Sequence, residues 1–291
     1  MGAVVVGQLA RDVVMVMERL PDAGSSGPVR ERLEQLGGKG ANQAVGLSQL
    51  GVPAALVAVA GDDPVGDALL ARAAVDGVDV SHVVRRAGTP TGLIVEVLED
   101  GGRWRYLEHL PQGVLLTEAD VRAAEGALRA ADAVLVQLQQ PLTAVRAAVE
   151  VAGGLVVLDG VVTDRALLRG ADVLRADARE TAMLLGVPAR EKDVLDAAPG
   201  LLDAGPKLLA FALEEGGDLF VWRGGHETVP HAGGTVVDTT GGGDALTAAL
   251  TAALLSGSSP REAGRFAVAA AGDVVTRAGG RPAFTRRPPS G

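Results

Sequence analysis

The chain has 291 residues and a formal net charge of −9, because 36 acidic residues outnumber 27 basic ones. This balance argues against a nucleic-acid partner, and the absence of cysteine excludes disulfides and thiolate catalysis. No apolar run reaches membrane-spanning length, and Arg11 and Asp12 interrupt the first one. We therefore expect a globular protein in the cytoplasm, with neither a signal peptide nor a membrane partner.

The first third of the chain predicts short strands mixed with two helices. Strands are expected at 4–7, 13–17, 30–36, 55–60, 93–98 and 104–109, and helices at 40–50 and 67–76. The first strand should lead into a loop that carries Asp12. The turn-rich stretch 21–28 separates two strands, and the turn at 99–102 should close a hairpin.

The remainder of the chain alternates between helical and extended patterns. Helices are expected at 118–129, 142–152, 179–185, 244–255 and 260–275, and strands at 133–137, 155–159, 173–176, 207–212 and 219–222. Such alternation predicts an α/β protein with a parallel sheet covered by helices on both faces. Because no repeat or linker interrupts the pattern, we expect a single domain over 1–291.

Three consecutive glycines, Gly241, Gly242 and Gly243, stand directly before Asp244, between a short β-type run at 236–237 and an Ala/Leu-rich helical run. Glycines allow backbone N–H groups to approach an anion closely, and the positive end of the following helix would point at the same place. The aspartate can then accept a proton from a hydroxyl that attacks a bound phosphoryl group. The pattern predicts a kinase site without a Walker lysine, and its alternative is a Gly-rich loop with a helix-capping aspartate.

A second glycine-rich stretch, Gly-Gly-Lys-Gly-Ala-Asn-Gln-Ala at 37–44, opens another helix. Together the two stretches resemble the two signatures of the PfkB family of carbohydrate kinases, and within that family most closely those of the ribokinases. The turn at 61–66 resembles the family's G-D-D-x-x-G, and Gly92 after Thr89-Pro90-Thr91 resembles its S-T-G. The stretch 238–282 follows the ribokinase pattern without a gap, so the resemblance covers nearly the whole chain.

The resemblance implies a three-layer α/β/α fold with a mainly parallel sheet. It also implies a small β-lid, formed by about 13–36 and 92–109, that covers the sugar and joins a homodimer. The implied activity is ATP-dependent phosphorylation of the primary hydroxyl of a pentose such as ribose. In that reaction Asp244 would be the base, and Gly241, Gly242 and Gly243 would form the anion hole.

By resemblance, five residues form the sugar site, namely Asp12, Gly38, Lys39, Asn42 and Gln139. Asp12 would accept two vicinal hydroxyls, and Lys39 and Asn42 would donate to others; a turn residue and a solvated charge are the plainer alternatives for Asp12 and Lys39. Two positions depart from the ribokinase pattern, since Ala10 replaces an asparagine and Gln139 replaces a glutamate. Both departures bear on which sugar is bound.

The nucleotide side departs further from the family. Asp177-Ala178-Arg179-Glu180 stands in place of N-x-x-E, and Glu180 would act through water on Mg²⁺ and phosphate. The remaining nucleotide residues implied by position are Leu213, Glu214, Gly216 and Val268. Leu213 follows Phe211-Ala212 where the family commonly has T-x-G, for which an apolar strand end is the alternative. These departures predict weaker nucleotide binding or a donor other than ATP.

A loop for a monovalent cation is implied by further matches to the family. Its residues would be Asp238, Thr240, Val274, Arg277, Gly279 and Ala283. Carbonyl and carboxylate oxygens suit a hard cation such as K⁺, which would brace the anion hole from behind. A plain loop acid is the alternative for Asp238.

Other functions remain open on sequence alone. A nucleoside or other polyol kinase of the same family is one alternative, and a sugar-binding regulatory protein that has lost turnover is another. The four histidines show no metal-ligand spacing, and we assign Trp104 and Tyr106 to lid packing or a dimer surface.

Overall fold

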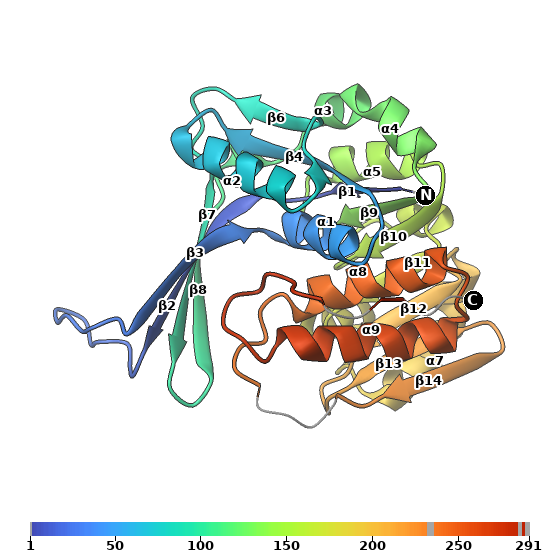
Figure 1. Cartoon of the computed structure of the whole chain (residues 1–291). Coiled ribbons are helices and arrows are strands. Elements are labelled where there is room, and N and C mark those ends of the chain that lie inside the picture. Colours follow the sequence, from blue (N-terminus) through green and yellow to red (C-terminus); the bar gives the residue numbers. More distant parts are fainter. Residues whose placement is uncertain (1, 232–235, 285–286, 289–291) are drawn as a thin grey trace.

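The computed structural model describes residues 2–231, 236–284 and 287–288, and a ten-stranded sheet forms its centre (Figure 1). The strand order is β14-β13-β12-β11-β10-β9-β1-β4-β5, and β6 pairs with β4 beside this path. The strands are β1 (Ala3–Val6), β4 (Ala54–Gly61), β5 (Val78–Asp79), β6 (Val83–Arg86), β9 (Ala133–Gln137), β10 (Leu155–Asp159), β11 (Val173–Ala176), β12 (Leu208–Ala212), β13 (Asp218–Trp222) and β14 (Gly225–Val229). All pairs are parallel except β12–β13 and β13–β14, so the predicted mainly parallel sheet is confirmed.

The central strands, such as β1, are apolar on both sides because helices cover both faces of the sheet. In β1, Ala3 and Val5 belong to one buried cluster and Val4 and Val6 to the other. The first cluster packs under α1 (Lys39–Gln49), α2 (Pro64–Val75), α8 (Gly242–Leu255) and α9 (Pro260–Val274). The second packs under α3 (Glu118–Ala123), α4 (Glu125–Ala130), α5 (Leu142–Val151), α6 (Ala178–Leu185) and α7 (Glu191–Asp203). The three-layer α/β/α architecture is thus confirmed.

A separate four-stranded sheet, which we call the lid, projects from the body at the left of Figure 1. Its order is β3-β2-β7-β8, formed by β3 (Glu31–Gly37), β2 (Ala10–Met17), β7 (Gly92–Glu99) and β8 (Arg103–His109). The predicted β7–β8 hairpin is confirmed. The predicted loop around Asp12 is wrong, because β2 begins at Ala10, three residues before the expected start, and carries Asp12 within the strand.

Several elements differ from the expectations. The helix expected at 118–129 is two helices that meet at Ala124, where ψ is 8°. The strands β5, β6 and β14 and the helix α7 were not expected. Helix α8 begins at Gly242 rather than at Asp244, and Val236 and Val237 lie outside any strand.

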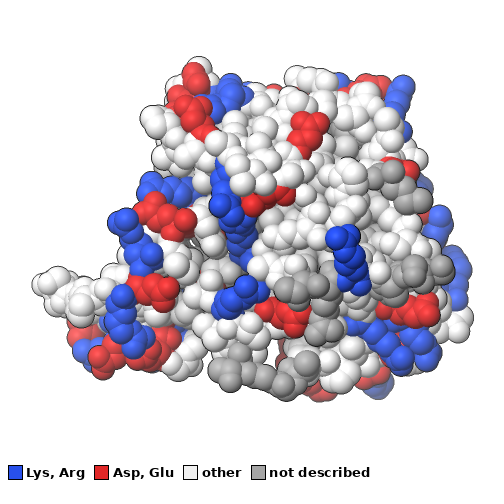
Figure 2. All heavy atoms as spheres, in the orientation of Figure 1, with Lys and Arg blue, Asp and Glu red and all other residues white. Residues whose placement is uncertain are grey.

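The surface mixes charges of both signs. On the face shown in Figure 2, basic and acidic side chains are interspersed. Ion pairs at the surface include Arg85–Asp67 (2.6 Å) and Arg122–Glu150 (2.6 Å). Within the described part of the chain, no helix is both long and apolar enough to cross a membrane.

Candidate active site

A cavity of about 530 Å³, which we call the first cavity, lies between the lid and the body. All five predicted sugar residues line it, namely Asp12, Gly38, Lys39, Asn42 and Gln139. Gly241, Gly243 and Asp244 line it as well. The structure therefore brings the two glycine-rich stretches together, although about 200 positions in the chain separate them.

Asp244 lies in the first turn of α8 and is 5% exposed. Its Oδ2 accepts a hydrogen bond from Asn42 Nδ2 (3.1 Å), and its Oδ1 accepts one from Gln43 Nε2 (3.2 Å). Burial raises the pKa of Asp244 to about 6, against the lowering effect of the Lys39 charge. At neutral pH this group is mostly a carboxylate, and its pKa lies near the range in which a general base works well.

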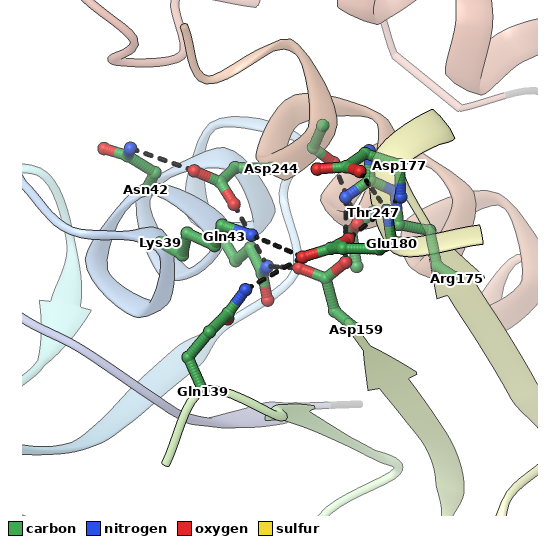
Figure 3. Close-up of polar contacts among 11 residues, drawn as sticks. Lys39, Asn42, Gln43, Gln139, Asp159, Arg175, Asp177, Glu180, Asp244 and Thr247 are labelled. Atoms are coloured by element: carbon green, nitrogen blue, oxygen red, sulfur yellow. Dashed lines mark hydrogen bonds and ion pairs between the residues drawn. The ribbon is translucent and has the colours of Figure 1, made fainter. Parts of the chain in front are cut away.

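A buried polar network continues behind Asp244 (Figure 3). Gln43 Nε2 also donates to Asp159 Oδ2 at 2.7 Å, and Arg175 Nη1 donates to Asp159 Oδ1 at 2.9 Å. Asp159 and Arg175 are register partners at the carboxyl ends of β10 and β11. The sequence analysis missed Gln43, Asp159 and Arg175; a charged residue inside each of two otherwise apolar strands was the available signal.

The three glycines before Asp244 have different roles. Gly241 precedes α8 with φ of 70°, and a side chain there would overlap the carbonyl of Gly280. The N–H of Gly242 donates to the carbonyl of Thr239 at 3.3 Å. The N–H groups of Gly243 and Asp244 lie in the first turn, where no acceptor within the helix exists. These two are thus the donors best placed for an anion.

Lys39 and Gln139, two of the predicted sugar residues, both contact Glu180, which the sequence analysis assigned to nucleotide binding. Lys39 Nζ lies 3.2 Å from Glu180 Oε1, and Gln139 Nε2 donates to the same oxygen at 2.9 Å (Figure 3). Glu180 also forms a capping box with Asp177 at the start of α6. Burial acts to lower the pKa of Lys39, but Asp159, Glu180 and Asp244 outweigh it and raise that pKa. The acceptor and nucleotide residues therefore form one charge network.

The inner face of the lid is acidic and aromatic. Asp12 and Glu96 both line the first cavity, and burial, reinforced by neighbouring carboxylates, raises the pKa of Asp12 to about 8 and that of Glu96 to about 7. Asp12 Oδ1 is buried and has no hydrogen-bond partner. The ring centroids of Trp104 and Tyr106 lie 4.7 Å apart, and both side chains line the same cavity. The sequence analysis expected only lid packing or a dimer surface for them.

A second cavity of about 420 Å³ adjoins the first, between α8, α9 and the ends of β12 and β13. Arg175, Thr239 and Gly243 line both cavities. Of the predicted nucleotide residues, Val268 lines the second cavity and Asp177 lines the first. Three others, Leu213, Glu214 and Gly216, lie in the turn between Ala212 and Asp218. Ala212 and Asp218 line the second cavity, whereas the three turn residues are not among its lining residues.

The predicted cation-loop residues converge behind the glycine triplet. The carboxylate of Asp238 accepts hydrogen bonds from the N–H of Thr240 (2.8 Å) and of Gly279 (2.7 Å). The carbonyl of Val274, at the end of α9, accepts from the N–H of Arg277 at 3.3 Å. Arg277 Nη2 in turn donates to the carbonyl of Ala283 at 3.3 Å. Carboxylate and carbonyl oxygens suit K⁺. The carbonyl of Ala283, however, already accepts a hydrogen bond from the guanidinium of Arg277.

Two adjoining cavities that share Arg175, Thr239 and Gly243, with the buried carboxylate of Asp244 in the wall of the first, suit a transfer between two bound small molecules. A model of the pfkB family of carbohydrate kinases matches residues 2–286. The chain belongs to this family, so it is a ribokinase-like sugar kinase, a phosphotransferase with an alcohol group as acceptor.

Ribokinases are among its most similar relatives. The ribokinase of Arabidopsis thaliana is 31% identical over 306 residues, which cover 98% of this chain and 78% of that protein. The crystal structure of ribokinase from Thermotoga maritima matches with a TM-score of 0.83 at 26% identity, over 96% of this chain and 94% of the other. Arabidopsis ribokinase complexed with ribose and ATP matches with a TM-score of 0.75 at 28% identity, over 96% and 93%.

Proposed function

We propose that the chain transfers the γ-phosphoryl group of ATP to the primary hydroxyl of a pentose such as ribose. The observation that carries the proposal is the place of Asp244, buried at the N-terminus of α8 between Asn42 and Gln43 and facing the first cavity. The acceptor hydroxyl would give its proton to this carboxylate as its oxygen attacks phosphorus. The N–H groups of Gly243 and Asp244 would hold the phosphoryl oxygens.

The sugar would lie in the first cavity under the lid. Asp12 has a buried oxygen without a partner there, and a pair of vicinal hydroxyls would satisfy it. Lys39 and Asn42 line the same wall of the cavity and can donate to further hydroxyls. The ribose and ATP named for the complexed Arabidopsis structure support this assignment.

The nucleotide would occupy the second cavity, with its phosphates at the junction formed by Thr239 and Gly243. Asp177 and Glu180 supply carboxylate oxygens of the type that Mg²⁺ prefers, so these residues would hold Mg²⁺ together with the donor phosphates. When bound, Mg²⁺ would neutralise charge on those phosphates. The oxygens around Asp238 suit K⁺, and a homodimer through the lid and a cytoplasmic location remain predictions.

A nucleoside acceptor is the second candidate. The Trp104–Tyr106 pair on the lid faces the first cavity, and an aromatic pair can stack against a base. Trp104 is 47% exposed, so it has free ring surface for such a contact.

A coupled ADP-release assay with Mg·ATP tests both candidates across pentoses, hexoses and nucleosides. Ribose or another pentose with the highest kcat/KM supports the first candidate, and a nucleoside with the highest value replaces it by the second. ADP release that does not depend on any acceptor would reject both. Replacing ATP by other nucleoside triphosphates in the same assay identifies the preferred donor.

A further inference from the structure

Arg175 occupies the junction between the two cavities, and neither the sequence analysis nor the family comparisons assign it a role. It lies near the end of β11, is 6% exposed, and lines the acceptor and nucleotide cavities together with Thr239 and Gly243. Its guanidinium packs against Gly243, because a Cβ atom placed there would lie 2.8 Å from Arg175 Cζ. The cation therefore stands beside the two N–H groups best placed for the phosphoryl group.

The guanidinium is only partly used by the protein. Arg175 Nη1 donates to Asp159 Oδ1 at 2.9 Å, whereas Arg175 Nε is buried without a hydrogen-bond partner. Asp159 is fully buried, and its second oxygen accepts from Gln43. Asp159 thus holds one side of the guanidinium fork and leaves other donors for a ligand. A buried donor without a partner is costly, and an anionic oxygen at the junction would satisfy it.

A purely structural ion pair explains these features less well. Buried ion pairs contribute little net stability because desolvation offsets the attraction. A pair that served only the core would have no reason to line two ligand cavities. Phosphoryl transfer, in contrast, places growing charge on equatorial oxygens where a fixed guanidinium stabilises it.

We propose that Arg175 is a catalytic residue that contacts the phosphoryl group as it passes from the second cavity to the first. The inference rests on the proposed function. In the step, the acceptor oxygen forms a bond to phosphorus while the bond from phosphorus to the leaving ADP oxygen breaks, and its electron pair stays on ADP. The acceptor proton moves to Asp244, and Arg175 remains protonated throughout.

The test compares Arg175→Ala and Arg175→Lys with the wild type. We expect kcat to fall by about 10³-fold or more in Arg175→Ala, the range for loss of a phosphate-stabilising arginine. Arg175→Lys keeps a charge near Asp159 but lacks the planar fork, so we expect at least a roughly tenfold loss. The KM for the sugar should stay within about threefold, and added guanidinium should restore part of kcat in Arg175→Ala. Arg122→Ala, on the exposed surface, is the matched control and should keep wild-type kcat.

A folded Arg175→Lys variant with kcat within about threefold of the wild type would overturn the inference, even if Arg175→Ala fails to fold. A second readout needs no turnover: calorimetric binding of Mg·ADP with aluminium fluoride, which mimics the phosphoryl group in transit. The wild type should bind this mimic at least roughly tenfold more tightly than either variant. Equal affinities of the wild type and the variants would also overturn the inference about Arg175. Tight, Arg175-dependent binding without phosphorylation of any of the tested acceptors would support the contact between Arg175 and the phosphoryl group and reject the proposed acceptor.

Discussion

Replacing Gly243 by alanine should separate the stability of α8 from its chemistry. Gly243 lies in the first turn of the helix, and its φ is not in the left-handed region, so alanine fits the backbone. The new methyl group, however, would lie 2.8 Å from Arg175 Cζ and from Arg175 Nη1. Because Asp159 holds the guanidinium in a buried pair, Arg175 cannot move aside freely. The methyl group would also intrude where the phosphoryl oxygens are proposed to lie.

The two effects have different sizes. Alanine is favoured over glycine in a helix by about 0.8–1 kcal/mol, and the close contact with the fixed Arg175 guanidinium would outweigh this gain. We therefore expect Gly243→Ala to lower the free energy of unfolding by about 1–2 kcal/mol, because overpacking against a buried group costs about 1–3 kcal/mol and the helix gain offsets only part of it. Alanine keeps the backbone N–H, but its methyl group would displace the phosphoryl oxygens from that donor. We therefore expect kcat to fall by about 10²–10³-fold, the size of losing one contact to a developing anion.

Urea unfolding and the coupled ADP-release assay measure the two quantities on the same preparation. Gly200→Ala is the matched control, because Gly200 lies inside α7, is exposed, and has no atom within 4 Å of an added Cβ. It should gain up to about 1 kcal/mol of stability and keep full kcat. A stable Gly243→Ala variant with wild-type kcat would refute the assignment of this turn to the phosphoryl group.

Three further predictions concern the carboxylates of the first cavity. Asp244→Ala should lower kcat by about 10²–10⁴-fold with little change in sugar affinity; near-normal turnover would exclude it as the base. Because the pKa of Asp244 is about 6, kcat in the wild type should fall roughly tenfold per pH unit below that value, and a flat acid limb would contradict the assignment. Burial raises the pKa of Asp12 from 3.8 to about 8, so its ionised form destabilises the fold above pH 8, an effect lost as the pH falls toward 4. Asp12→Asn should therefore raise the urea midpoint more at pH 9 than at pH 5 while lowering kcat/KM for the sugar; an unchanged sugar KM and kcat would remove Asp12 from the site.

The parts of the fold that sequence predicted well are those with local patterns. The alternation of apolar strands and amphipathic helices predicts the layers, and the turn at 99–102 predicts the β7–β8 hairpin. Helix α7 was missed because Pro199 and Gly200 interrupt its pattern, although Val194 and Leu201 bury its inner face. Here packing against the sheet outweighs weak helix propensity.

The site shows the same limit. The two glycine-rich stretches are local, so they indicate Asp244 and, in the first cavity, Gly38, Lys39, Asn42, Gly241 and Gly243. Asp159 and Arg175 carry no local motif, and Gln43, although inside the stretch 37–44, shows its role only through its contact with Asp159. These contacts join residues 116 and 16 positions apart. Nor does the sequence show that Glu180 meets Lys39, a contact across 141 positions. Such partners are defined only when the strand ends and α1 meet in three dimensions.

The most direct test of the account is to identify the phosphorylated product by mass spectrometry after incubation with Mg·ATP and ribose, for the wild type and for Asp244→Ala in parallel. The account predicts a pentose monophosphate from the wild type, formed together with one ADP, and at least a hundredfold less from the variant, in line with the loss of a general base. A wild type that yields no ribose phosphate, or a variant that yields as much as the wild type, would contradict the central claim.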